Sequence, residues 1–168
     1  MSRLWCIGLG AALVLCVPCL AADNDSLLDH MTGRWVLTGT IEGRQTTHDV
    51  EAQWILQNTY IRLTEVSREK DKAGTPQYEA EVLIAYDVAK QHYVCFWYDI
   101  TGVAAPDSGG GVALRQGDTL PFLFKIDGAV FHTTFAWQSA ADTWTWTMDG
   151  EDKGKLVPFA RLTLKRAP

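Results

Sequence analysis

Short runs of β-prone residues alternate with tight turns along almost the whole chain, and this pattern constrains the fold more than any other feature. The segment Thr143–Met148 shows it most simply, because threonine alternates there with Trp144, Trp146 and Met148. Side chains alternate across a strand, so this segment has one apolar face and one polar face. Short strands at regular spacing are typical of a β-sandwich or a β-barrel.

We predict an all-β fold of about ten strands, preceded by a short helix at Ser26–Met31 that plugs one end. The predicted strands are Gly33–Gly39, Thr46–Gln57, Thr59–Lys70, Tyr78–Tyr86, Gln91–Ile100, Val112–Gln116, Thr119–Asp127, Val130–Gln138, Thr143–Met148 and Leu156–Lys165. Asp127-Gly128 is a strong signal for a two-residue hairpin turn. Because nearly every connection fits a hairpin, the sequence favours a closed antiparallel up-and-down β-barrel, which has no free edges.

The first residues have the features of a signal peptide. Arg3 precedes the apolar run Leu4–Leu20, and small residues offer a cleavage site near Ala21 and Ala22. The apolar run is short for a membrane span, and acidic residues follow it at once. We therefore predict a cleaved signal peptide at residues 1–22 and an exported domain at residues 23–168, periplasmic or secreted, with no membrane span.

Cleavage at this position would leave Cys95 as the only cysteine, so the mature chain is predicted to have no intramolecular disulfide. Cys95 lies in the middle of an apolar strand and is predicted to be a small core residue. Loss of Arg3 would change the formal charge from −5 to −6. Without a basic cluster to neutralise phosphates, nucleic-acid binding is disfavoured.

The strand Gln91–Ile100 avoids water on both faces. Its side chains divide into two sets, with Phe96 and Tyr98 in one and Trp97 and Asp99 in the other. Either one face fills the barrel while the other packs under a covering segment, or some of these aromatic residues line a ligand cavity. The loop Thr101–Gly111 that follows is either a lid or an ordinary surface loop.

Two further residues have two possible orientations. If Tyr60 and Arg62 face the lumen, the Arg62 guanidinium could bind a carboxylate; if they face solvent, Arg62 is a surface charge. His132 would point into the lumen only if the alternating set with Phe131 faced outward. The candidate ligand-binding residues are Trp54, Tyr60, Arg62, Phe96, Tyr98, Asp99 and His132.

Motifs that would indicate catalysis are missing from the sequence. It contains no Gly-x-Ser-x-Gly elbow and no phosphate-binding loop. His48 and Asp49 are adjacent, so they point to opposite faces of a strand, and no histidine has a partner at metal-ligand spacing. We therefore predict no catalytic residue, no metal and no cofactor.

A longer pattern resembles a known family. It consists of Leu28-x-x-Met31-x-Gly33-x-Trp35, Trp54-Ile55-Leu56-x-x-Thr59-Tyr60, Ile84-Ala85-Tyr86-Asp87 and Tyr93-x-x-x-Trp97-x-Asp99-x-x-Gly102. This pattern resembles the bacterial family DUF1579, a domain of unknown function, and the helical turn before Gly-x-Trp resembles the start of the calycin superfamily, which includes the lipocalins. The resemblance implies a lipocalin-like barrel without an established activity.

A weaker resemblance concerns heme. The ending Met148-Asp149-Gly150 with Leu162 is faintly similar to nitrobindins, which bind heme through a histidine on the last strand. The last predicted strand here, Leu156–Lys165, has no histidine. His92 or His132 would have to substitute, so heme binding of this type is not expected.

Three hypotheses about function follow. In the favoured one, an exported barrel binds a small apolar or amphipathic molecule in its lumen. In the second, the barrel is an enzyme with a tyrosine, His132 and Asp99 as acid and base. In the third, a solid barrel is an envelope interaction module with an exposed apolar patch. The sequence does not indicate a particular ligand or oligomeric state.

Overall fold

The computed structural model of the protein describes residues 25–102, 110–126 and 128–168. The predicted signal peptide, residues 1–22, lies outside the described residues. Residues 103–109 of the predicted loop Thr101–Gly111 and Asp127 of the predicted hairpin turn also lie outside them.

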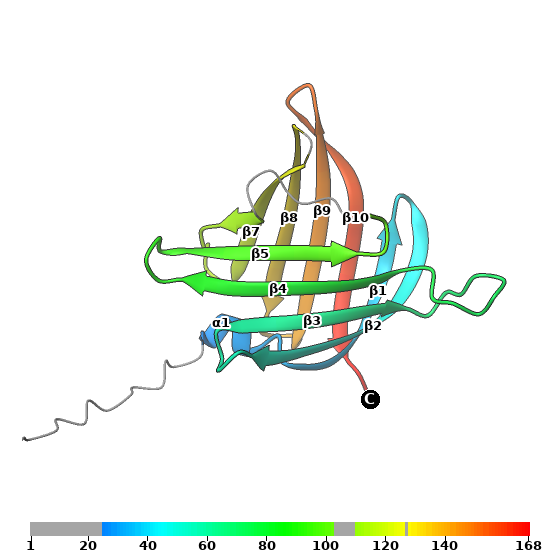
Figure 1. Ribbon diagram of the computed structural model, residues 1–168, viewed down its shortest axis with the longest axis horizontal. Coiled ribbons are helices and arrows are strands. Elements are labelled where there is room, and N and C mark those ends of the chain that lie inside the picture. The colour runs from blue at the N-terminus through cyan, green and yellow to red at the C-terminus, as the bar shows by residue number, and fades with distance from the viewer. Residues whose placement is uncertain (1–24, 103–109, 127) are drawn as a thin grey trace, which may run out of the picture.

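Ten antiparallel strands form a closed barrel, in which each strand pairs with the next along the chain and the last pairs with the first. The strands are β1 (Gly33–Ile41), β2 (Arg44–Ile55), β3 (Tyr60–Ser67), β4 (Glu79–Asp87), β5 (His92–Asp99), β6 (Gly111–Ala113), β7 (Thr119–Ile126), β8 (Ala129–Gln138), β9 (Thr143–Asp152) and β10 (Lys155–Arg166). In Figure 1, β3–β5 run across the view and β8–β10 run crosswise to them. The predicted up-and-down barrel and its strand order are confirmed.

The pairing of β1 with β10 closes the barrel. It runs from Trp35 opposite Arg166 to Ile41 opposite Ala160. Gly39 lies in this ladder with φ of 150°, and a Cβ added there would lie 2.1 Å from the carbonyl oxygen of Arg161. The close approach of these two strands therefore requires glycine at position 39.

The hairpin between β9 and β10 is tighter than predicted. The sequence predicts strands that end at Met148 and resume at Leu156, with a loop between them. In the structure the strands continue to Asp152 and resume at Lys155. Lys153 and Gly154 both have positive φ, 51° and 75°, and so form a two-residue turn that extends the ladder on both sides.

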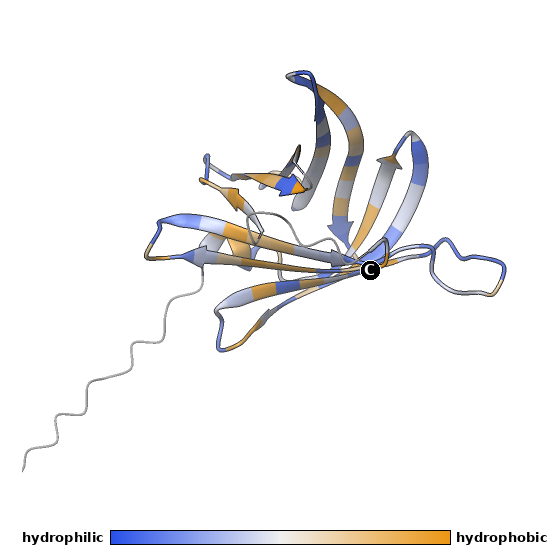
Figure 2. Ribbon diagram, turned by 45° about the horizontal axis from the view of Figure 1, so that its top comes forward, coloured by the Kyte–Doolittle hydropathy of each residue, from blue (hydrophilic) through white to orange (hydrophobic). Residues whose placement is uncertain are grey.

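Alternation along the strands separates the core from the exterior. In β9, Trp144, Trp146 and Met148 are buried inside the barrel and the threonines between them are only partly buried, as predicted. β8 alternates in step, with Phe135 and Trp137 buried. Figure 2 shows the resulting change between hydrophobic and hydrophilic residues along the strands. Cys95 is a free, fully buried core residue, as predicted, and burial raises the pKa of its thiol.

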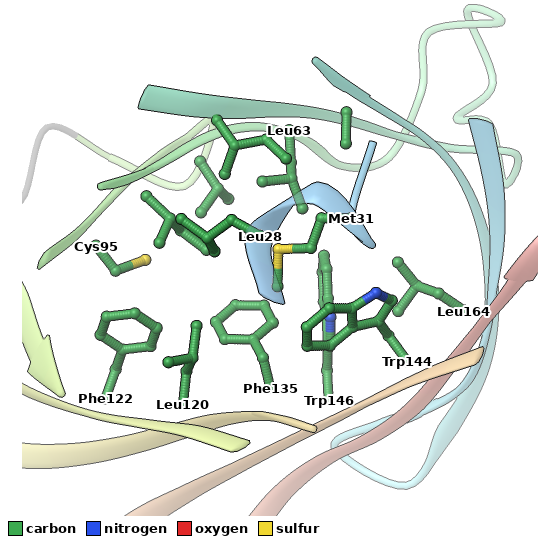
Figure 3. Packing of buried hydrophobic residues seen from close by; sticks show 14 of the residues in the cluster. Leu28, Met31, Leu63, Cys95, Leu120, Phe122, Phe135, Trp144, Trp146 and Leu164 are labelled. Carbon is green, nitrogen blue, oxygen red and sulfur yellow. The ribbon is translucent and has the colours of Figure 1, made fainter. Parts of the chain in front are cut away.

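One end of the barrel is plugged by α1 (Ser26–Asp29) and the residues after it. Asp25 caps this helical turn by accepting hydrogen bonds from the backbone N–H groups of Leu27 and Leu28. Leu27, Leu28 and Met31 are buried, and Figure 3 shows Leu28 and Met31 among the aromatic side chains of the core. In the described part of the chain, no helix has the length and apolar character needed to cross a membrane.

Ring nitrogens on the barrel hold the plug in place. Trp35 Nε1 donates to the carbonyl oxygen of Met31 at 2.7 Å, and Trp144 Nε1 donates to that of His30 at 3.3 Å. Trp54 Nε1 donates to Asp29 Oδ1 at 2.7 Å. These bonds satisfy both the indole N–H groups and the acceptors at the end of α1.

The barrel wall has a weak seam at β6. This strand has three residues and pairs with β5 only at Tyr93, Val94 and Cys95. Its pairing with β7 is limited to Val112 opposite Leu123. Among the described residues, the wall between β5 and β7 therefore has the shortest ladder in the barrel.

We predict that Leu28→Ala lowers the free energy of unfolding by about 2–5 kcal/mol, because it leaves a cavity in the plug. Leu114→Ala is the matched control, since Leu114 is 65% exposed, and it should change stability by less than about 0.5 kcal/mol. Urea denaturation followed by tryptophan fluorescence measures both. Equal effects of the two substitutions would contradict the packing role of the plug.

Candidate functional site

The end of the barrel opposite α1 contains a cavity of about 670 Å³. Its walls come from the C-terminal ends of β1, β3, β5, β7 and β9 and from the N-terminal ends of β2, β8 and β10. Antiparallel pairing brings these ends together, just as it brings the other ends together around the plug. The rim includes the exposed residues Glu42 and Arg44.

One wall of the cavity is apolar. It consists of Ile41, Trp97, Phe124, Ile126, Phe131, Met148, Phe159 and Leu162. Phe131 and Phe159 contact each other edge to face, with ring centroids 5.3 Å apart. The apolar part of a ligand would meet several aromatic faces and no charged group on this wall.

The opposite wall is polar and is built around a buried ion pair. His48 of β2 contacts Glu65 of β3 through Nδ1 and Oε1, and each side chain is 2% exposed. His48 Nε2 lies 2.7 Å from Thr46 Oγ1, which donates to Glu69 Oε2 at 3.0 Å. Ser67 Oγ also donates to this Glu69 oxygen, at 2.8 Å. A continuous chain of hydrogen bonds therefore runs from Glu65 to Ser67.

The hydrogen atoms of this chain can be assigned. Thr46 has one hydroxyl hydrogen, and it points to Glu69 because an ionised carboxylate only accepts hydrogen bonds. Thr46 Oγ1 must then accept from His48 Nε2–H. One proton remains for the contact between His48 and Glu65, so these two side chains together carry no net charge.

Glu69 is held in its ionised form. Burial raises the pKa of its carboxyl group, but hydrogen bonds from Ser67, from its own backbone, from Thr46 and from Thr47 outweigh burial and bring the pKa below its ordinary value. The Thr47 backbone N–H donates to Oε1 at 2.9 Å. Both carboxylate oxygens of Glu69 therefore accept hydrogen bonds from the protein.

Tyr78 connects the ion pair with Asp99. Its ring stacks on that of His48, with centroids 5.6 Å apart, and its hydroxyl donates to Asp99 Oδ2 at 3.2 Å. The same hydroxyl accepts from Trp97 Nε1 at 3.0 Å. Burial, and the negative charges of Glu65 and Asp99, raise the pKa of Tyr78, so its hydroxyl stays protonated and donates.

Glu65 keeps one oxygen without a partner. Its Oε1 contacts His48, while Oε2 is buried and has no hydrogen-bond partner among the residues that the structure describes. An unpaired buried carboxylate oxygen is costly. In either protonation state of the ion pair this oxygen can accept a hydrogen bond, so the polar wall keeps one acceptor without a partner among the described residues.

Asp99 is the one sequence-predicted candidate that lines the cavity. Trp54 lies at the opposite end, bonded to Asp29 of the plug. Phe96 and Tyr98 belong to the outward set of β5, because Tyr93, Cys95 and Trp97 face inward, and Tyr98 is 56% exposed. The structure therefore places Phe96 and Tyr98 on the outer face of the barrel, away from this cavity.

Tyr60, Arg62 and His132 also point away from the lumen. Ile61 and Leu63 are buried inside the barrel, so Tyr60 and Arg62 lie on the outer face, where the Arg62 Nε atom is 3.8 Å from Glu81 Oε2. The solvent-facing orientation of Arg62 is the observed one. The set with Phe131 faces inward, so His132 faces outward and lies 3.4 Å from Glu151. His132 lies on the outer face and Asp99 lines the cavity, so the acid and base of the enzyme hypothesis do not lie together.

His48, Glu65 and Tyr78 were not among the candidates, and Trp97 was named only as one of the aromatic residues of its strand that could line a cavity. A partial signal exists for Glu65, because strict alternation in Thr59–Lys70 places it on the same face as Ile61 and Leu63. A carboxylate on an apolar face indicates a buried partner. That partner could not be identified without the strand register, which places Val50, two residues after His48, opposite Glu65.

No group of three or more His, Cys, Asp or Glu side chains within residues 25–102, 110–126 and 128–168 could hold a metal ion. A scan against models of protein families gives no match to this chain. A search of curated proteins gives no match either. The resemblance to DUF1579 therefore stays a prediction.

We predict that Glu69→Gln lowers the free energy of unfolding at pH 7 by about 1 kcal/mol, because its oxygens accept several hydrogen bonds. The lowered pKa means that the contribution of Glu69 is present above the unfolded value of 4.5 and is lost as the pH falls through the folded value. The difference between variant and wild type should therefore narrow below pH 4.5.

Urea denaturation from pH 7 to acid pH measures this effect. Glu51→Gln is the control, since Glu51 is exposed on β2. Stability curves of wild type and Glu69→Gln that stay parallel throughout the acid range would contradict the assignment of Glu69 as an ionised carboxylate in the folded protein.

Proposed function

We propose that this protein is an exported, lipocalin-like barrel of the DUF1579 type that binds a small apolar or amphipathic molecule in its lumen. The observation that carries the proposal is the cavity of about 670 Å³, with an apolar wall facing a polar one. Ligand cavities in proteins have about this size and combine apolar walls with a few polar groups. The predicted signal peptide supports export.

The resemblance to calycins is supported by the start of the barrel. A helical turn precedes β1, and Trp35 of the Gly33-x-Trp35 motif is buried between the plug and the last strand. The Arg166 guanidinium of β10 lies 3.8 Å from the centroid of the Trp35 ring. This contact joins the plug, the first strand and the last strand at the closed end.

The two alternative functions have less support. An acid–base enzyme needs a histidine nitrogen that can exchange a proton with a substrate, but both ring nitrogens of His48 are engaged by protein groups. A solid barrel that acts only through its surface needs a filled interior, whereas the end opposite the plug is open space. Binding in the lumen therefore remains the proposal.

We predict that N-phenyl-1-naphthylamine, an uncharged apolar fluorophore, binds saturably and increases its fluorescence. Met148→Trp should weaken this binding about tenfold or more, because Met148 lines the cavity and the larger indole takes up part of the space for the probe. The control is Val157→Trp, which adds the same side chain at a 50% exposed position of the same hairpin. Failure of the probe to bind wild type, or equal binding to Met148→Trp and wild type, would contradict the proposal.

A further inference from the structure

The polar wall of the cavity has a buried acceptor without a partner among the described residues, while several of its donors are already used. The Tyr78 hydroxyl donates to Asp99, Trp97 Nε1 donates to Tyr78, and Gln77 Nε2 donates to the Lys70 carbonyl oxygen. The hydroxyl of Thr46 and the Nε2–H of His48 are used within the hydrogen-bond chain. Glu65 Oε2, in contrast, is a buried acceptor without a partner among the described residues. The missing partner of this wall is a hydrogen-bond donor.

The net charge of the cavity lining also favours a donor, and in particular one that carries a positive charge. The described residues that line the cavity include the four carboxylates Glu42, Glu65, Glu69 and Asp99, against one guanidinium, Arg44. Glu42 and Arg44 are both exposed at the rim and offset each other, and His48 neutralises Glu65, so the charges of Glu69 and Asp99 remain. The lumen therefore keeps a negative charge inside low-dielectric walls, where charge interactions are stronger than in water.

Aromatic faces lie next to these carboxylates. Trp97 and Tyr78 line the cavity and are joined by a hydrogen bond, and Tyr78 is in turn bonded to Asp99. Indole and phenol rings attract cations through their π faces. A cation near Tyr78 would have both Asp99 and the ion pair of Glu65 and His48 around it.

From these observations we infer that the ligand is an amphipathic cation, whose ammonium group lies against Glu65, Tyr78 and Asp99 and whose apolar body packs on Phe124, Phe131 and Leu162. This inference rests on the proposed function and specifies the class of ligand. It excludes fatty acids as preferred ligands, because a carboxylate head would meet carboxylates. Arg62, which could have bound such a head, lies on the outer face.

Displacement of N-phenyl-1-naphthylamine by three decyl compounds tests the inference. Decylamine, decanol and decanoate share one apolar chain and differ in the charge of the head group. At neutral pH, and below the concentrations at which they form micelles, decylamine should displace half of the probe at a concentration about tenfold or more below that of decanoate. It should also act at a lower concentration than decanol.

Variants then locate the head group. Asp99→Asn and Glu65→Gln should each reduce the preference for decylamine over decanol. Glu81→Gln is the matched control, because it removes the same charge from the outer face, where Glu81 is 48% exposed, and it should leave the preference unchanged. Glu65→Gln also disturbs the pair with His48, so binding of the probe is used to check that this variant folds. If Glu65→Gln does not fold, Asp99→Asn alone decides the result.

The outcomes separate this inference from the proposed function. If the probe does not bind wild type, the proposed function itself fails. If the probe binds and the three compounds displace it equally, or decanoate displaces it best, the cationic ligand is wrong while lumen binding stands. An equal loss of preference in Glu81→Gln and Asp99→Asn would also overturn the inference, because the preference would then come from overall charge.

Discussion

The pairing of β1 with β10 is the interaction on which the rest of the structure depends. Without it the sheet would have two free edges, and neither the plugged core nor the cavity would be enclosed. The pairing requires glycine at position 39, where the backbone of β10 leaves no room for a Cβ. At its other end, Arg166 of β10 covers Trp35 and donates to the Thr32 carbonyl oxygen, so closure and plugging share residues.

The two ends of the barrel have different physical characters because the inward residues change along the strands. In β9 and β8 the inward residues at the plugged end are Trp144 and Trp137, large rings that leave no space. In β3 the inward residues change from Ile61 and Leu63 to Glu65 and Ser67 toward the other end. The same strand thus contributes to the solid core and to the polar wall of the cavity.

Alternation and turn residues were sufficient to predict the barrel, its strand order and the inward position of Trp144 and Trp146. The site was harder to predict, because it depends on which of two alternating sets faces inward. For the aromatic strand both sets are apolar, so the sequence could not choose between Phe96 and Trp97. The contact of His48 with Glu65 depends on cross-strand register, which sequence spacing within one strand does not contain.

The short ladder at β6 has a consequence for Cys95, which lies directly opposite Gly111 on this seam. A buried thiol with a raised pKa reacts with alkylating reagents only when the surrounding structure opens. Segments held by few hydrogen bonds open locally at a lower free energy than the whole molecule. The labelling rate of Cys95 in the folded protein therefore reports how often β5 and β6 separate. It measures the local opening of the barrel wall without an introduced cysteine.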